Sequence, residues 1–307
     1  MKNIVTVLGS LNVDTTATIK KIPLPGETIA SENKSSAAGG KGANQAVAAA
    51  RAGATVNFIG KVGKDDEGKF MLECMKEDKV DTSNISEDNL VGTGSAIILL
   101  DEKGQNSIIV YGGANQRVNE KDIIAAHDKI EESDFIIAQF ETPQESALEA
   151  FKYAKAHDVV TILNPAPAAN ILPELLQYTD VIVPNETESA TLTGIEVTDE
   201  ASMLKNYEAF KKMGVSSLII TVGDKGAFYA NDSGHEFIPA FKVKAVDTTA
   251  AGDTFIGALS SQLKKDFSNM DDSIVFAQRA SSITVQGLGA MPSIPTFKQI
   301  QEASNKA

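Results

Sequence analysis

The segment VDTTAAGDTF, residues 246–255, joins two patterns that predict its structure. The alternating stretch FKVKAV leads into it, and the helical pattern FIGALSSQL follows from Phe255. We therefore predict a strand-to-helix junction with a helix beginning near Ala250 or Ala251. Free N–H groups of residues 250–253 and the helix dipole would form an anion site, and the small side chains would let a ligand approach the backbone.

Asp253 places a carboxylate inside this predicted anion site, where like charges repel. As an N-terminal cap alone the residue would be ordinary. Its position makes chemical sense if the carboxylate accepts a proton from a hydroxyl that attacks a phosphoryl group. The segment therefore indicates a small-molecule kinase with Asp253 as the general base, in which Gly252, Ala251 and Ala250 supply backbone donors.

Short β-branched runs alternate with helical patterns along the chain. The runs are IVTVLG (4–9), VNFIG (56–60), FIIAQF (135–140), VVTIL (159–163), VIVP (181–184) and LIITV (218–222). This order predicts one α/β domain over residues 1–307, with a mostly parallel sheet flanked by helices. Segments 14–37 and 93–112 instead look like strand–turn–strand units, which predict either a small antiparallel β lid or two decorative hairpins.

Composition limits the classes of function. The 307 residues carry a net charge of −13, which argues against nucleic acid or an anionic membrane surface as a partner. Only three residues are arginines, so a phosphate must be attracted by local features. The single cysteine, Cys74, and the absence of a signal peptide or a long apolar stretch lead us to expect a cytoplasmic protein.

Polar residues follow several of the predicted strands. They are Asn12, Asp14, Glu141, the motif NPAPA, Asn185, Glu188 and the motif GDKG. Because ligands of an open parallel sheet bind beyond the carboxyl ends of its strands, we expect these residues to share one site.

A second glycine-rich junction, AAGGKGANQAVAAARAGA, precedes an alanine-rich helix. Its spacing matches neither the Walker A loop nor the dinucleotide fingerprint. A tightly packed helix with a flexible entry is one interpretation, but Lys41 and Asn44 are long polar groups in the tightest turn and favour a ligand site.

Together these motifs make the chain similar to the phosphofructokinase-B-type (ribokinase-like) carbohydrate kinases. GSLNVD, PLPGET, GGKGANQA, YGGAN, LNPAPA, PNETE and VDTTAAGDTF occur in the family's order along essentially the whole chain. The motifs GGKGANQA and NPAPA most resemble those of the ribose-phosphorylating members. The resemblance implies ATP-dependent phosphorylation of D-ribose at its 5-hydroxyl, with Mg²⁺, potassium activation and a homodimer paired through the lid.

The resemblance also implies roles for individual residues. Sugar hydroxyls would be held by Asn12, Asp14, Gly40, Lys41, Asn44 and Glu141, with Asp253 as the base. The nucleotide would contact Asn185, Thr221, Gly223, Asp224, Lys225, Gly226, Gly252 and Gln278. Asn185 and Glu188 would organise Mg²⁺ through water, and potassium would be bound by Asp247, Thr249, Thr284, Gly287, Gly289 and Ser293.

Three segments depart from the family pattern near the nucleotide. Gln278 stands where relatives usually have Asn or His, TVGDKG lacks the usual serine, and QGLGAMPS lacks a basic residue often found there.

Other functions also remain open. They are a related kinase for deoxyribose, fructose or a nucleoside, a catalytically silent sugar- or nucleotide-binding regulator, and a dinucleotide-dependent oxidoreductase, which the missing fingerprint disfavours.

Overall fold

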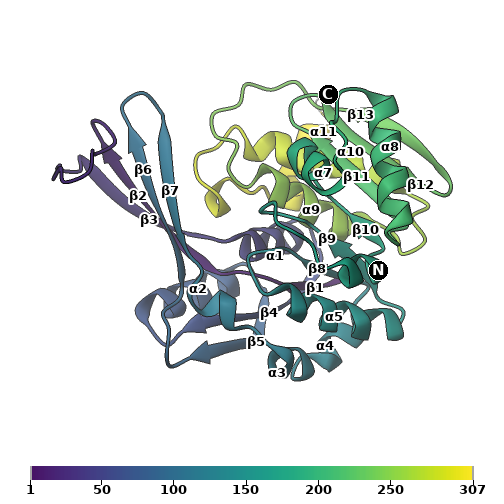
Figure 1. The fold of residues 1–307 in the computed structure, drawn as a ribbon, viewed down its shortest axis with the longest axis horizontal. Coiled ribbons are helices and arrows are strands. Elements are labelled where there is room, and N and C mark those ends of the chain that lie inside the picture. Colours follow the sequence, from purple (N-terminus) through teal and green to yellow (C-terminus); the bar gives the residue numbers. More distant parts are fainter. Residues whose placement is uncertain (1, 306–307) are drawn as a thin grey trace.

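A computed structural model of the chain describes residues 2–305. Its main feature is a nine-stranded sheet in the order β13-β12-β11-β10-β9-β8-β1-β4-β5 (Figure 1). These strands are β1 (Ile4–Leu8), β4 (Thr55–Gly63), β5 (Asp81–Asp88), β8 (Phe135–Ala138), β9 (Val160–Leu163), β10 (Val181–Ile182), β11 (Ser217–Val222), β12 (Gly226–Asn231) and β13 (Gly234–Pro239).

The predicted α/β fold is confirmed. Each of the six β-branched runs forms a strand, and the seven strands from β11 to β5 in the sheet order are parallel. The strands β5, β12 and β13 were not predicted. DTSNISED in β5 is polar because this edge strand is only partly covered, and β12 and β13 form an antiparallel edge hairpin.

Helices cover both faces of the large sheet (Figure 1). The α-helices are α1 (Lys41–Arg51), α2 (Asp66–Glu77), α3 (Glu120–Ile124), α4 (His127–Glu131), α5 (Gln144–Ala156), α6 (Pro173–Gln177), α7 (Glu186–Thr193), α8 (Glu200–Lys212), α9 (Ala251–Gln262), α10 (Met270–Thr284) and α11 (Phe297–Ser304). The short 3₁₀ helices are η1 (Gly113–Arg117) and η2 (Met291–Ser293). Within residues 2–305, the helices lack the length and apolar character needed to span a bilayer.

Alternating side chains of the strands build two separate cores. On β8, Phe135 and Ile137 point toward helices α1, α2, α9 and α10, whereas Ile136 and Ala138 point toward α3 to α6 and α8. This alternation follows from the period of two along a strand. A strand covered on both faces must be apolar throughout, which is why the central runs contain so few polar residues.

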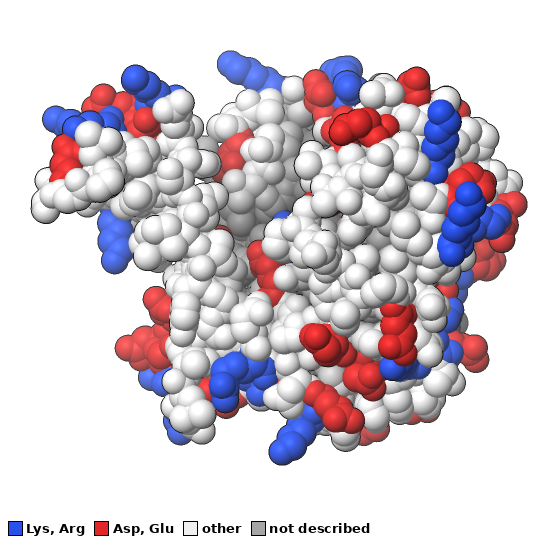
Figure 2. Space-filling model, in the orientation of Figure 1, with Lys and Arg blue, Asp and Glu red and all other residues white. Residues whose placement is uncertain are grey.

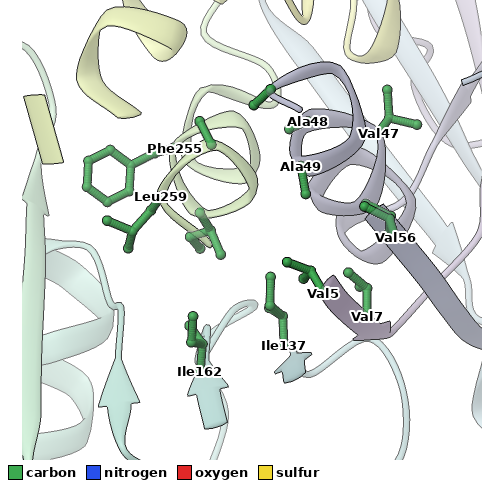
Figure 3. Packing of buried hydrophobic residues seen from close by; sticks show 14 of the residues in the cluster. Val5, Val7, Val47, Ala48, Ala49, Val56, Ile137, Ile162, Phe255 and Leu259 are labelled. Carbon is green, nitrogen blue, oxygen red and sulfur yellow. The ribbon is translucent and has the colours of Figure 1, made fainter. Parts of the chain in front are cut away.

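Helices α1 and α9 pack closely over the first core (Figure 3). Gly257 of α9 makes this approach possible, because a Cβ atom at this position would lie 2.4 Å from the carbonyl oxygen of Gln45 and 2.6 Å from the Cβ of Ala48. Small residues on both helices therefore set their spacing. As a result, the N-terminal turns of the two helices lie side by side.

A second, four-stranded sheet projects from the body (Figure 1). Its order is β3-β2-β6-β7, with β2 (Asn12–Ile19), β3 (Asn33–Gly39), β6 (Gly94–Asp101) and β7 (Asn106–Tyr111). Both predicted strand–turn–strand units are therefore present, each antiparallel within itself. The pairing between them was not predicted: β2 and β6 run parallel. We call this four-stranded sheet the lid.

We predict that Gly257→Ala lowers the free energy of unfolding by roughly 1–3 kcal/mol, because the added methyl group must push α1 and α9 apart. Gly252→Ala on the same helix is the matched control. A Cβ atom at Gly252 meets nothing within 4 Å, so helix propensity should leave stability unchanged or higher. Urea unfolding of both variants without ligands measures the difference, and equal stabilities would contradict the packing argument.

Candidate active site

The predicted anion site lies at the beginning of α9. The prediction of a strand before it was wrong, because residues 241–246 are irregular despite their alternating pattern. Ala250 has a left-handed backbone with φ of 60°, and the helix begins at Ala251. The N–H of Ala251 donates to the carbonyl of Thr248 at 3.2 Å. The N–H groups of Gly252 and Asp253 belong to the first turn, where an α-helix offers no carbonyl partner. The first turn thus presents donors and the positive end of the helix dipole.

Gly252 keeps the space in front of these donors open. It lines two neighbouring cavities, and a Cβ atom there would meet no protein atom within 4 Å. Packing within the protein therefore does not require glycine at this position. The open space in front of Gly252 would let a ligand come close to the backbone.

The first cavity measures about 220 Å³. Its lining comes from the carboxyl ends of strands and the first turn of α9, and includes Lys41, Asn164, Asn185, Glu188, Thr221, Gly252 and Asp253. Residues that follow separate strands in the sequence therefore meet at one edge of the sheet, as expected from the topology.

Asp253 is buried beside this cavity and accepts hydrogen bonds on both carboxylate oxygens. Asn44 Nδ2 donates to Oδ2 at 3.0 Å, and Gln45 Nε2 donates to Oδ1 at 2.9 Å. Burial raises the pKa of Asp253, and the Lys41 ammonium and the two amide donors oppose this effect. A carboxylate with a raised pKa that is still held by donors suits a general base.

Lys41 is the cation of the site. Its backbone N–H donates to Glu141 Oε2 at 3.0 Å, and its side chain lines the first cavity. Burial alone would lower the pKa of the ammonium, but the carboxylates of Asp253, Glu141 and Glu188 outweigh burial and hold the pKa above its usual value. Lys41 therefore stays charged and supplies local positive charge in a strongly acidic protein.

The predicted sugar-binding residues lie where the lid leaves the body. Asn12 and Asp14 occupy the beginning of β2, and Gly40 is the N-terminal cap of α1 with φ of 92°. Burial, together with the carboxylates of Glu141 and Asp253, raises the pKa of Asp14 to about 6. The Asn12 side chain is buried and accepts from Asn115 Nδ2 at 2.8 Å.

A cleft separates the lid from the body, and acidic side chains lie within it (Figure 2). The residues Asn12, Asp14, Gly40, Asn44 and Glu141 are outside the lining of the two cavities described here. They are linked to the first cavity through Lys41 and through the bond from Asn44 to Asp253.

The second cavity, of about 510 Å³, adjoins the first at Gly252. It is lined by the predicted nucleotide residues Asn185, Thr221, Gly223, Asp224, Gly226, Gly252 and Gln278. Lys225 is outside both linings, whereas Lys242 and Phe241 contribute to the second. Gln278 is turned partly into the protein, because its Nε2 donates to the carbonyl of Ile238 at 2.8 Å.

Asn185 and Glu188 form a capping box at the beginning of α7. Glu188 N donates to Asn185 Oδ1 at 2.8 Å, and Asn185 N donates to Glu188 Oε2 at 2.9 Å. Burial raises the pKa of Glu188, against the effects of this backbone bond and of Lys41. Both residues also line the first cavity, while Asn185 Oδ1 and Glu188 Oε2 accept the two bonds of the cap.

Two of the predicted potassium residues, Thr249 and Gly289, contact Asp247. Oδ1 accepts from the N–H and hydroxyl of Thr249, and Oδ2 accepts from the N–H of Gly289 at 2.9 Å. Partial burial would raise the pKa of Asp247, but these donors outweigh it and keep the pKa low. Ser293 donates to the Gly289 carbonyl, while the Thr284 hydroxyl is buried against Thr254.

Sequence reasoning missed four polar residues around the site. Gln45 donates to Asn164 and to the base, Gln139 donates to Gln45, and Ser10 donates to Glu141. All four sit within or beside the quoted motifs, so their positions were visible. Their side-chain directions were not, because two adjacent residues of a helix point to different sides.

The arrangement combines a buried carboxylate, an adjacent ammonium, helix N-terminal donors and two connected cavities. This set can accept a proton from a hydroxyl while it stabilises negative charge beside it. Such a combination is suited to phosphoryl transfer between a small polar acceptor and a nucleotide.

Known proteins resemble the chain closely. A ribokinase of Staphylococcus aureus is 47% identical over 303 residues, 98% of this chain and 100% of that protein. A bifunctional ribokinase/ribose-5-phosphate isomerase A of Fructilactobacillus sanfranciscensis is 50% identical over all of this chain, which spans 57% of that protein's length. The structure of Arabidopsis thaliana ribokinase complexed with ribose and ATP matches with a TM-score of 0.92 at 30% identity, covering 99% of each chain.

The match also holds at the level of a whole family. The sequence profile described as pfkB family carbohydrate kinase matches residues 2–297. This range contains all strands of both sheets and the helix N-terminus that carries Asp253. The chain therefore belongs to the pfkB family of carbohydrate kinases.

Proposed function

We propose that the protein transfers the terminal phosphoryl group of ATP to the 5-hydroxyl of D-ribose, giving D-ribose 5-phosphate and ADP. The observation that carries this proposal is Asp253, buried at the N-terminus of α9 between the first cavity and the lid-side residues. The named relatives, described as ribokinases, support ribose as the acceptor.

In this proposal the Asp253 carboxylate accepts the proton of the attacking sugar hydroxyl. The first-turn N–H groups of α9, chiefly those of Gly252 and Asp253, and the Lys41 ammonium face the charge that develops on the transferred group. Burial of Asp253 strengthens these interactions because the local dielectric constant is low.

The sugar would lie between the lid and α1. Asp14 can accept hydrogen bonds from two neighbouring hydroxyls, and Asn12, Gly40, Lys41, Asn44 and Glu141 complete its surroundings. A missing hydroxyl would leave a buried polar group unpaired, so we expect ribose to be preferred over 2-deoxyribose.

The nucleotide would occupy the second cavity, with its phosphates toward Gly252. Asn185 and Glu188 offer the oxygen ligands that suit a hydrated Mg²⁺, and the ion would neutralise phosphate charge when bound. Lys225 and Gln278 stay proposed nucleotide contacts, Lys225 from the neighbouring turn and Gln278 from α10.

A related kinase for deoxyribose, fructose or a nucleoside is the second candidate. The Asp14 contact disfavours 2-deoxyribose, which lacks the 2-hydroxyl. Fructose and nucleosides keep neighbouring hydroxyls, so they are separated from ribose by the substrate assay and not by this contact. A silent binding protein would have no need of the buried base at the anion site.

We predict that ADP release, measured with a coupled assay over ribose, 2-deoxyribose, fructose and adenosine, is most efficient with ribose. Asp253→Asn should lower kcat with ribose by roughly 10²–10⁴-fold, because the amide cannot accept the proton. Calorimetry should show that the variant still binds ribose. Equal efficiency across the panel would refute ribose selectivity, and near-normal turnover of the variant would refute the base.

We propose, further, that potassium activates the enzyme. Asp247 already connects its own turn to the 284–293 loop, and Val246 and Asp247 donate to the carbonyl of Val285. The carboxylate accepts from N–H and hydroxyl groups, so a bound cation would use its remaining lone pairs together with carbonyl oxygens of the two loops. Such an ion would hold both loops still beside the anion site.

Turnover in potassium should therefore exceed turnover in sodium at matched ionic strength, and Asp247→Ala should abolish the difference. The comparison needs a third arm with a bulky organic cation. Identical rates in all three salts would show that no activating site operates.

We also propose that residues 1–307 form one domain, that the protein is cytoplasmic and that it dimerises through the lid. The lid exposes apolar residues on paired strands, among them Ile97 opposite Ile109. A partner lid would bury them.

Analytical ultracentrifugation at micromolar concentration should give a dimer. The double variant Ile97→Asp/Ile109→Asp should give a monomer, because it places charges in the proposed contact. Ile124→Asp, at an exposed isoleucine of α3 outside the lid, is the control and should remain dimeric. A monomeric unmodified protein would contradict the proposal.

A further inference from the structure

Two buried glutamines lie in a row behind Asp253. Gln45 of α1 and Gln139, which follows β8, are both 0% exposed. Gln139 Nε2 donates to Gln45 Oε1 at 2.7 Å, and Gln45 Nε2 donates to Asp253 Oδ1 at 2.9 Å. Side chains from three separate elements thus form one hydrogen-bonded row that ends on the carboxylate.

The direction of the Gln45 amide is fixed by its neighbours. Asn164 Nδ2 donates to the carbonyl of Val183 at 3.0 Å, so Asn164 Oδ1 faces Gln45 at 3.1 Å and can only accept. Asp253 Oδ1 also accepts when ionised. Gln45 must therefore turn its NH₂ group toward both oxygens, which leaves its carbonyl oxygen facing Gln139.

The bare backbone of Gly9 leaves the space that the Gln139 side chain occupies. A Cβ atom on Gly9 would lie 2.4 Å from Gln139 Oε1, so only glycine leaves room for this side chain. The Gln139 amide then supplies the donor that the Gln45 carbonyl oxygen needs. Reversal of Gln45 would point its oxygen at two acceptors and its NH₂ group at a donor, which is unfavourable at both ends.

We propose that Gln45 is a positioning residue, which holds the Asp253 carboxylate ionised and aligned for proton abstraction, and that Gln139 keeps Gln45 in its donor orientation. This inference rests on the proposed role of Asp253 as the base. Asn44 holds the second carboxylate oxygen, so the two amides together fix the plane of the carboxylate. Donors to a carboxylate favour its charged form.

Four charged groups from other positions also act on Asp253. Lys41 of α1 attracts it, whereas Asp14 of β2, Glu141 after β8 and Glu188 of α7 repel it. Among the hydrogen bonds of residues 2–305, the Gln45 side chain bonds to none of these four. Replacement of Gln45 therefore changes one donor on the base and leaves the surrounding charges in place.

The test uses three matched substitutions in the full chain: Gln45→Met, Gln139→Met and Gln262→Met. Gln262 is the control, because it lies on α9 with the base but roughly 13 Å further along the helix, where its amide bonds to the carbonyl of Ala52. For each variant, kcat is measured against pH at saturating ribose and MgATP, and ribose binding is measured by calorimetry.

We expect Gln45→Met to lower kcat at neutral pH by about tenfold or more and to move the acid limb of the profile upward by roughly one pH unit. The sign follows because loss of a donor to the charged form makes the base easier to protonate. Ribose affinity should change by less than about twofold, because Gln45 touches the base and not the sugar. Gln139→Met should shift the limb less in the same direction, and Gln262→Met should leave it unchanged.

A folded Gln45→Met protein with an unchanged acid limb, or with lost ribose affinity and normal kcat, would overturn the inference. If Gln45→Met does not fold, Gln45→Asn and Gln139→Met replace it in the test. An unchanged acid limb in both of these variants would also overturn the inference. Asp253→Asn, measured in parallel, separates the positioning role of Gln45 from the role of Asp253 as the base. Inactive Asp253→Asn with an unshifted Gln45 variant refutes the positioning role alone, whereas active Asp253→Asn refutes the base and the positioning role together.

Discussion

The close contact between α1 and α9 is the constraint on which the site depends. Gly257 lets the two helix axes approach, and the first turns of both helices then meet at the edge of the sheet. Asn44 and Gln45 from one helix reach Asp253 on the other only because of this spacing. Packing in the core and alignment of the base are thus consequences of the same small residues.

The site also resolves an electrostatic problem. A protein of net charge −13 repels an anionic nucleotide at long range, and screening by salt reduces that repulsion beyond about 10 Å. At short range the positive charge comes from the half-buried Lys41, from Lys242 beside the second cavity and from backbone dipoles. These groups sit at fixed positions, so they require little reorganisation, and the three arginines can serve elsewhere. Arg51 and Arg117, for example, pair with Asp78 and Asp88.

The sequence allowed prediction of the features that local chemistry determines. The apolar runs predicted the buried strands, and the small residues before Asp253 predicted the beginning of α9 to within a residue. The edge strand β5 was not predicted because its sequence is polar. The parallel pairing of β2 with β6 was not predicted because it joins two segments that lie far apart in the sequence. Likewise, the row from Gln139 to Asp253 joins residues more than 90 positions apart, and only the fold brings them together.

The lid has a consequence for how such a protein can change during evolution. β2 begins with Asn12 and Asp14, and β3 runs directly into Gly40 and α1. The strands of the lid therefore continue directly into residues of the candidate active site. A deletion that trims it to the body would also remove the proposed sugar contacts, whereas the loops at its tips can lengthen freely. Proteins of this architecture should vary in sequence and length at the far end of the lid and should keep the part of the lid that joins the body.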